Sequence, residues 1–101
     1  MKIFLKRNQI SVIDDEAFAI NKALHLDLSL NSLRTVRKEV FEKIVDYPAS
    51  AVQLRGNKQI VCNCDLKWII EQPKCMERIS GIRCNGKYFR ELKLADLGNC
   101  S

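Results

Sequence analysis

The only histidine of the chain lies close to an aspartate and a serine, the three residue types of a hydrolytic triad. His25, Asp27 and Ser29 are two residues apart, so on an extended strand their side chains point to one side. Neighbouring side chains on one face of a strand are about 7 Å apart, at the edge of hydrogen-bond reach. No glycine-rich phosphate loop, metal motif or paired-acid signature accompanies the row. We therefore expect no enzymatic activity and no catalytic residue, and interpret the row as part of a surface.

All five cysteines lie in the C-terminal forty residues: Cys62, Cys64, Cys75, Cys84 and Cys100. Structural zinc sites usually contain C-x-x-C pairs, whereas this chain has C-x-C and its only histidine far upstream. The cluster instead indicates disulfides formed in an oxidising compartment. Cys62 and Cys64 have poor geometry for bonding each other, so each should reach a distant cysteine. We expect no metal and no cofactor.

Composition and charge fit one small domain with a charged surface. The chain has 101 residues, 47% of them hydrophobic, and a net charge of +5 with a pI of about 9.1. Acidic residues are interleaved among the basic ones, which is typical of a solvated surface. The alternative is attraction to an acidic partner, either a protein or a sulfated glycan. Nucleic acid is not expected, because no basic stretch carries regularly interleaved aromatic residues.

The start of the chain conflicts with the compartment that the cysteines indicate. A short apolar stretch begins the sequence, but Lys6 and Arg7 interrupt it, and no apolar run is long enough for a signal core or a membrane span. We expect a C-terminal piece of a longer protein that is secreted or lies on the extracellular face of the plasma membrane, with its signal peptide outside this sequence. The first expected strand, from Lys2 to Leu5, would leave an open edge, which further upstream repeats would cover.

Apolar residues recur around three asparagines, Asn8, Asn31 and Asn57. They stand three and five positions before each asparagine, and two, five and ten positions after the first two: Ile3, Leu5, Ile10, Ile13 and Phe18; Leu26, Leu28, Leu33, Val36 and Phe41; Val52 and Leu54. This pattern resembles the L-x-x-L-x-L-x-x-N-x-L motif of the leucine-rich-repeat family and covers residues 2 to about 60.

The resemblance implies an α/β fold: a fragment of a leucine-rich-repeat solenoid, with short parallel strands on its concave face and an irregular convex side. The alternating apolar pairs independently predict short strands with one buried face. In the family, the asparagines form a ladder between successive coils, since their side chains both donate and accept hydrogen bonds. Phe18 and Phe41 should fill the core on the convex side, whereas Asn21 stands where the repeat expects an apolar residue.

The stretch from Cys62 to Ile70 marks a change of organisation. Leu66, Ile69 and Ile70 share one helical face, so one short helix is predicted, which Asn63 or Asp65 can cap and Pro73 ends. Its C-x-C-x-L-x-W pattern resembles the cysteine-rich C-terminal cap of extracellular leucine-rich-repeat proteins. We therefore divide the chain into about two and a half repeats (residues 1–60) and a cap (residues 61–101).

The same resemblance implies the disulfides Cys62–Cys84 and Cys64–Cys100. Cys75 departs from the four-cysteine pattern and could be a free thiol, an intermolecular bridge or a competitor for Cys84. The run from Cys84 through Asn85 and Gly86 to Leu92 is similar to caps of the arthropod type, a group that includes proteins labelled as the non-catalytic subunit of a shrimp luciferase. Asn99-Cys100-Ser101 matches the N-glycosylation pattern N-x-S.

These expectations favour a non-enzymatic extracellular protein-interaction module. Residues between the core positions of the strands would face outward on the concave side, which repeat proteins use for recognition. They are Lys2, Phe4 and Lys6; His25, Asp27 and Ser29; and Ala51, Gln53 and Arg55. Phe4 is the expected anchor for a protein partner. The alternatives are a purely structural cap and a non-catalytic subunit of a secreted enzyme complex.

Overall fold

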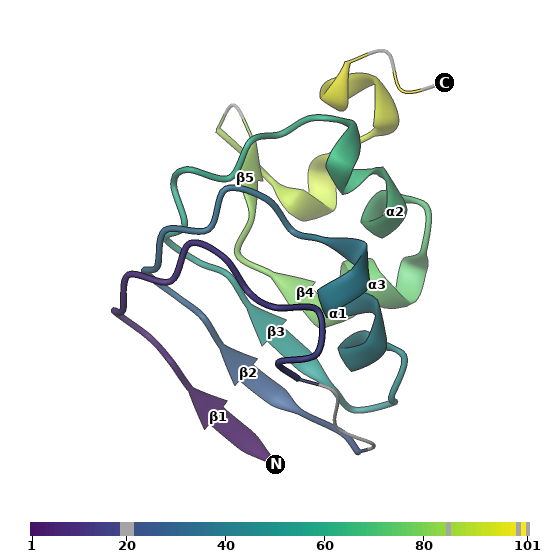
Figure 1. Cartoon of the computed structure of the whole chain (residues 1–101). Coiled ribbons are helices and arrows are strands. Elements are labelled where there is room, and N and C mark those ends of the chain that lie inside the picture. Colours follow the sequence, from purple (N-terminus) through teal and green to yellow (C-terminus); the bar gives the residue numbers. More distant parts are fainter. Residues whose placement is uncertain (19–21, 85, 99, 101) are drawn as a thin grey trace.

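A computed structural model describes residues 1–18, 22–84, 86–98 and 100 (Figure 1). Asn21, Asn85 and the N-x-S pattern at Asn99, singled out above, lie outside these residues. The fold is mixed α/β and is built on a parallel four-stranded sheet in the order β1-β2-β3-β4. Its strands are β1 (Lys2–Phe4), β2 (His25–Asp27), β3 (Ala51–Gln53) and β4 (Ile79–Ser80).

Helices and short hairpin strands make up the rest of the ordered elements. They are α1 (Lys38–Val45), α2 (Lys67–Ile70) and α3 (Pro73–Arg78); the 3-10 helices η1 (Cys64–Leu66), η2 (Phe89–Glu91) and η3 (Leu94–Leu97); and the antiparallel pair β5 (Arg83–Cys84) and β6 (Lys87–Tyr88). The helices gather on one side of the sheet and leave the other side open (Figure 1). The sheet thus has one face against the core and one toward solvent.

The strands form because their side chains alternate between these two faces. Leu26, Val52 and Ile79 pair across neighbouring strands and are almost fully buried. Ile3 is paired with Leu26 but is only half-buried, since β1 is the edge strand of the sheet. The predicted short parallel strands are therefore present, and the core lies on the helical side.

Buried asparagines join successive turns of the chain behind the strands. Asn31 Nδ2 donates to the carbonyls of Leu5 (2.9 Å) and Leu28 (3.0 Å), and its Oδ1 accepts from the Ile10 N–H. Asn57 repeats the arrangement with the carbonyls of Leu28 and Leu54 and the N–H of Leu33. Asn8 is exposed and donates only to Leu5 and Lys6, near it in the sequence. Each buried amide thus satisfies backbone groups of two adjacent turns.

The residue before each of these asparagines has a positive φ. The angles are 59° at Arg7, 56° at Leu30 and 82° at Gly56. This left-handed conformation lets the chain turn sharply after the strand, and the asparagine that follows is buried in the second and third turns. At Gly56 there is a second reason for glycine, because an added Cβ would lie 2.4 Å from Leu30 Cδ2.

Gly56→Ala should destabilise the protein by about 1 kcal/mol more than Gly86→Ala, measured by urea unfolding. Both glycines have nearly the same positive φ, but a Cβ at Gly86 meets nothing within 4 Å. In the control variant, Gly86→Ala, the only expected cost is the backbone strain of alanine at a positive φ, about 1–2 kcal/mol. The extra cost at Gly56 comes from displacing the Leu30 side chain from its rotamer. It should disappear in a Leu30→Ala background, and persistence there would contradict the assigned contact.

The prediction of an irregular convex side was wrong for the segment after β2. Helix α1 lies there and buries Val40, Phe41, Ile44 and Val45. Their spacing of one, three and one residues places all four on one helical face, so packing against the core stabilises a regular helix. Phe41 is buried as expected, while Phe18 is only partly buried against the core.

The prediction of a cap with one short helix was also wrong. The Asn63 side chain accepts from the Asp65 N–H and starts η1, which continues into α2. Pro73 follows the end of α2 as predicted, but it also begins α3, because proline at the first helical position needs no N–H partner. After α3 the chain adds β4 to the sheet, with Ile79 opposite Val52. The part of the chain expected to form only a cap thus also contributes a strand to the sheet.

Two disulfides fasten the C-terminal part. They join Cys62 to Cys84 and Cys64 to Cys100, with Cα–Cα distances of 5.8 and 5.4 Å. This is the pairing that the family resemblance implied. Cys75 is a free thiol that is completely buried, and this burial raises the pKa of the thiol. A buried neutral thiol of this kind behaves as a small apolar core residue.

Candidate binding surface

The solvent-facing side of β1–β3 and the residues directly after them carry the side chains expected to bind a partner. We call this surface the outer face. The register places Lys2, His25 and Ala51 in one row, and Phe4, Asp27 and Gln53 in the next. Lys2, Phe4, Lys6, His25 and Arg55 are exposed; Ala51, Asp27 and Gln53 are partly exposed. The parallel register therefore brings residues from three distant parts of the sequence onto one surface.

Phe4 is the conspicuous member of this surface. Its side chain is 74% exposed, although it is a large aromatic residue. It is two residues from both Lys2 and Lys6 in the sequence, of which only Lys2 is on β1, and it lies beside Asp27 in the register. Exposed aromatic side chains bordered by polar groups are common anchors in protein interfaces, because they bury a large area at low entropic cost.

The expectation that Ser29 faces outward was wrong. Ser29 is 5% exposed, and its hydroxyl donates to Asp27 Oδ1 at 2.5 Å, while its N–H donates to the same oxygen at 2.9 Å. Ser29 lies beyond the end of β2, so the turn brings it much closer to Asp27 than an extended strand would. These two hydrogen bonds lower the pKa of the Asp27 carboxyl. Asp27 is thereby held ionised and oriented.

Gln53 and Arg55 end the surface on the side of β4. The Gln53 side-chain oxygen accepts from the Arg55 N–H at 2.8 Å, which fixes the turn after β3. A Cβ at Gly81 would lie 2.2 Å from that oxygen and 2.3 Å from Arg55 N, so the chain after β4 passes directly against this turn. Glycine alone allows this close approach, because it has no Cβ. The Arg55 side chain itself remains exposed.

The structure does not join His25, Asp27 and Ser29 into a hydrogen-bonded triad within the described residues. In the part of the chain that the structure describes, no side-chain hydrogen bond joins His25 to Asp27 or Ser29. The Ser29 hydroxyl is instead a donor to a carboxylate, with no base positioned to activate it. Among the same residues, no group of three or more His, Cys, Asp or Glu side chains is arranged for a metal ion.

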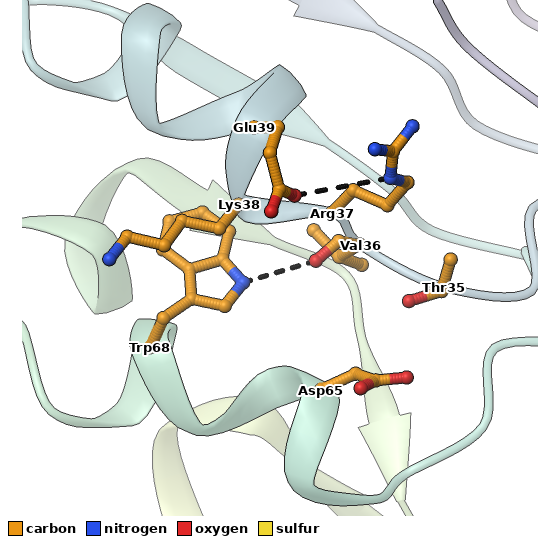
Figure 2. Close-up of a pocket in the computed structure, with 7 residues that line it drawn as sticks. All are labelled: Thr35, Val36, Arg37, Lys38, Glu39, Asp65 and Trp68. Carbon is orange, nitrogen blue, oxygen red and sulfur yellow. Dashed lines mark hydrogen bonds and ion pairs between the residues drawn. The ribbon is translucent and has the colours of Figure 1, made fainter. Parts of the chain in front are cut away.

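A shallow cleft lies elsewhere, between the start of α1 and the η1–α2 segment (Figure 2). Its volume is about 420 Å³, and it is lined by Thr35, Val36, Arg37, Lys38, Glu39, Asp65 and Trp68. The Trp68 indole donates to the Val36 carbonyl at 3.1 Å, and Arg37 pairs with Asp15 at 2.7 Å. Trp68 and Arg37 thus have structural partners. Sequence reasoning did not single out this cleft, because its two walls are about thirty residues apart and share no motif.

Comparison with protein-family models, curated proteins and solved structures gives no significant match for this chain. None of the helices in its described part is long and apolar enough to span a bilayer. The functional conclusion therefore comes from the residues and their arrangement.

Proposed function

We propose that this chain is a non-enzymatic extracellular protein-interaction module, the C-terminal part of a secreted or cell-surface leucine-rich-repeat protein. The outer face of the sheet is its binding surface. The observation that carries the proposal is the 74% exposed Phe4 on the edge strand β1, next to Asp27 in the register and two residues from Lys2 and Lys6 in the sequence. A large exposed aromatic side chain bordered by charged residues is well suited to anchor a protein partner.

The family assignment is supported by three features that recur together. Each of the first three strands is followed by a left-handed residue and an asparagine, at Arg7–Asn8, Leu30–Asn31 and Gly56–Asn57. The two buried asparagines connect adjacent turns of the chain. The spacing of the strands agrees with the leucine-rich-repeat motif read from the sequence.

The extracellular assignment is supported by the disulfides. Cys62–Cys84 and Cys64–Cys100 close loops within a small domain, as is typical of proteins that fold in an oxidising compartment. A non-catalytic subunit of a secreted enzyme complex is the second candidate, which the similarity of the Cys84–Leu92 run to arthropod caps favours. Both candidates require a protein-binding surface.

Site-specific photo-crosslinking tests the proposal. With benzoylphenylalanine in place of Phe4, irradiation in the extracellular fluid of the producing cells should give a discrete protein adduct. The same group in place of Val12, which is 80% exposed in the loop after β1, should not give that adduct. Val12 is a matched control, because it is equally accessible but lies off the outer face.

Affinity for the captured partner should fall by about tenfold or more on Phe4→Ala, and to a smaller extent on Lys6→Ala and Arg55→Ala. Calorimetric titration measures the affinity, and circular dichroism should show an unchanged fold, since none of these side chains is in the core. Unchanged affinity in all three variants would leave only a structural role for the sheet. Co-purification of the partner with an enzymatic activity would favour the subunit candidate.

A further inference from the structure

Charge is distributed unevenly between the two sides of the molecule. Of the 12 acidic residues, Asp27 alone lies in strands β1–β4 or in the turns directly after β1–β3, where Lys6 and Arg55 also lie. The others lie in loops, helices and the C-terminal part: Asp14, Asp15, Glu16, Glu39, Glu42, Asp46, Asp65, Glu71, Glu77, Glu91 and Asp96. The outer face carries Lys2, Lys6 and Arg55 around that single carboxylate, so its formal charge is positive.

The cations of the outer face are among those that form no ion pair in the described part of the chain, although Lys6 is near enough to Asp27 to help lower the pKa of its carboxyl. The ion pairs of the structure involve Arg37, Lys38, Lys43, Lys74 and Lys87. Within the described residues, Lys2, Lys6 and Arg55 belong to none of them. Asp27 is in turn occupied by two hydrogen bonds from Ser29. The exposed cations are thus available to anionic groups from outside the protein.

We infer that the partner of the outer face is an acidic segment of another protein that also presents an apolar side chain to Phe4. This inference rests on the proposed function and adds the chemistry of the partner. Lys2 lies on β1 two residues before Phe4, and Lys6 lies two residues after Phe4, in the turn that follows the strand. Carboxylates spaced around an apolar residue on an extended segment match this positive–aromatic–positive row.

Other occupants fit the same surface less well. A second copy of the chain would place one positive outer face against another, and like charges in contact oppose association. A sulfated glycan would satisfy the cations but would leave Phe4 without an apolar partner. Phe4 therefore distinguishes an acidic protein segment from an acidic glycan.

The test uses fluorescent peptides of equal length and the purified chain. A repeated Glu-Glu-Leu peptide should bind, a Lys-Lys-Leu peptide should not, and a Glu-Glu-Ser peptide should bind at least about fivefold more weakly. Raising the salt from about 50 to 500 mM should weaken Glu-Glu-Leu binding by about fivefold or more, because exposed charges are screened. Fluorescence anisotropy gives the affinities.

Matched variants locate the binding. Lys6→Glu and Arg55→Glu should each weaken Glu-Glu-Leu binding by about fivefold or more, whereas Arg90→Glu should leave it within about twofold. Arg90 is an equally exposed cation on η2, away from the outer face. Phe4→Ser should abolish the preference for Glu-Glu-Leu over Glu-Glu-Ser. Retention of the fold in each variant is checked by circular dichroism.

Each opposing outcome has a distinct meaning. Insensitivity to salt and to Arg55→Glu would overturn the inference. So would heparin binding that exceeds peptide binding and does not change with Phe4→Ser, which would point to a glycan. A crosslinked protein adduct at position 4, together with no binding of any acidic peptide, would overturn the acidic partner and leave the protein-interaction function standing.

Discussion

Asn57→Ala is expected to destabilise the protein by about 3–5 kcal/mol, whereas Asn8→Ala should cost less than about 1 kcal/mol. The Asn57 side chain serves three backbone groups: the carbonyls of Leu28 and Leu54, both at 2.9 Å, and the N–H of Leu33 at 3.2 Å. Asn57 is 7% exposed, and its removal leaves these groups without a partner in the interior. Each buried unsatisfied group costs about 1–3 kcal/mol, and water entering the vacated space offsets part of the sum.

Asn8 is the matched control because it occupies the corresponding place after β1. Its amide donates only to Leu5 and Lys6, and its side chain is exposed, so water replaces those bonds when it is removed. Urea unfolding followed by circular dichroism gives both free energies of unfolding. If the two substitutions lowered the free energy of unfolding by amounts that agree within about 0.5 kcal/mol, the role assigned to the buried Asn57 amide would be contradicted, because burial of the side chain would then make no difference.

Removing either disulfide should have a comparably large effect. The sequence separations are 22 residues for Cys62–Cys84 and 36 for Cys64–Cys100. The loop-entropy argument assigns about 3–4 kcal/mol to each, so losing both would remove a large part of the 5–15 kcal/mol typical of a small domain. Paired replacement of each bridge by alanines, followed by thermal and urea unfolding, measures the two contributions separately.

The two bridges should also differ in their order of reduction. Cys64 is exposed and Cys100 half-buried, whereas Cys84 is 2% exposed. A thiolate reductant must reach a sulfur atom, so Cys64–Cys100 should open first. Stepwise reduction with dithiothreitol and differential alkylation, read by mass spectrometry, reports the order. Earlier opening of Cys62–Cys84 would contradict the exposures that the structure assigns.

Throughout such an experiment, Cys75 should remain unalkylated until the protein unfolds. The thiol is fully buried, and burial raises its pKa, so little reactive thiolate forms. Labelling of Cys75 in the folded, oxidised protein would show that the core around α3 opens locally. It would therefore test the packing of α3 independently of the disulfides.

The sequence by itself determined the parts of this protein that depend on short-range periodicity. Alternating apolar residues predicted the first three strands and the inward side chains of Leu26 and Val52, because side chains on a strand alternate regularly between two faces. The placement of Lys2, Phe4 and Arg55 on the opposite face followed from the same alternation. The asparagines could be singled out because they recur at a fixed position after each strand.

Only the tertiary structure decided the features that depend on contacts between distant segments. Helix α1 stands where an irregular segment was expected: the spacing of Phe41 and its neighbours fits one helical face, but only the tertiary structure shows that this face packs on the core. Ser29 is buried instead of exposed, because the turn after β2 brings its hydroxyl within hydrogen-bond distance of the Asp27 carboxylate. Strand β4 joined the sheet from beyond Pro73, through pairing with a strand some 27 residues earlier. Asp27 and Gln53 likewise come to lie in one row with Phe4 only when strands from three parts of the chain pair side by side.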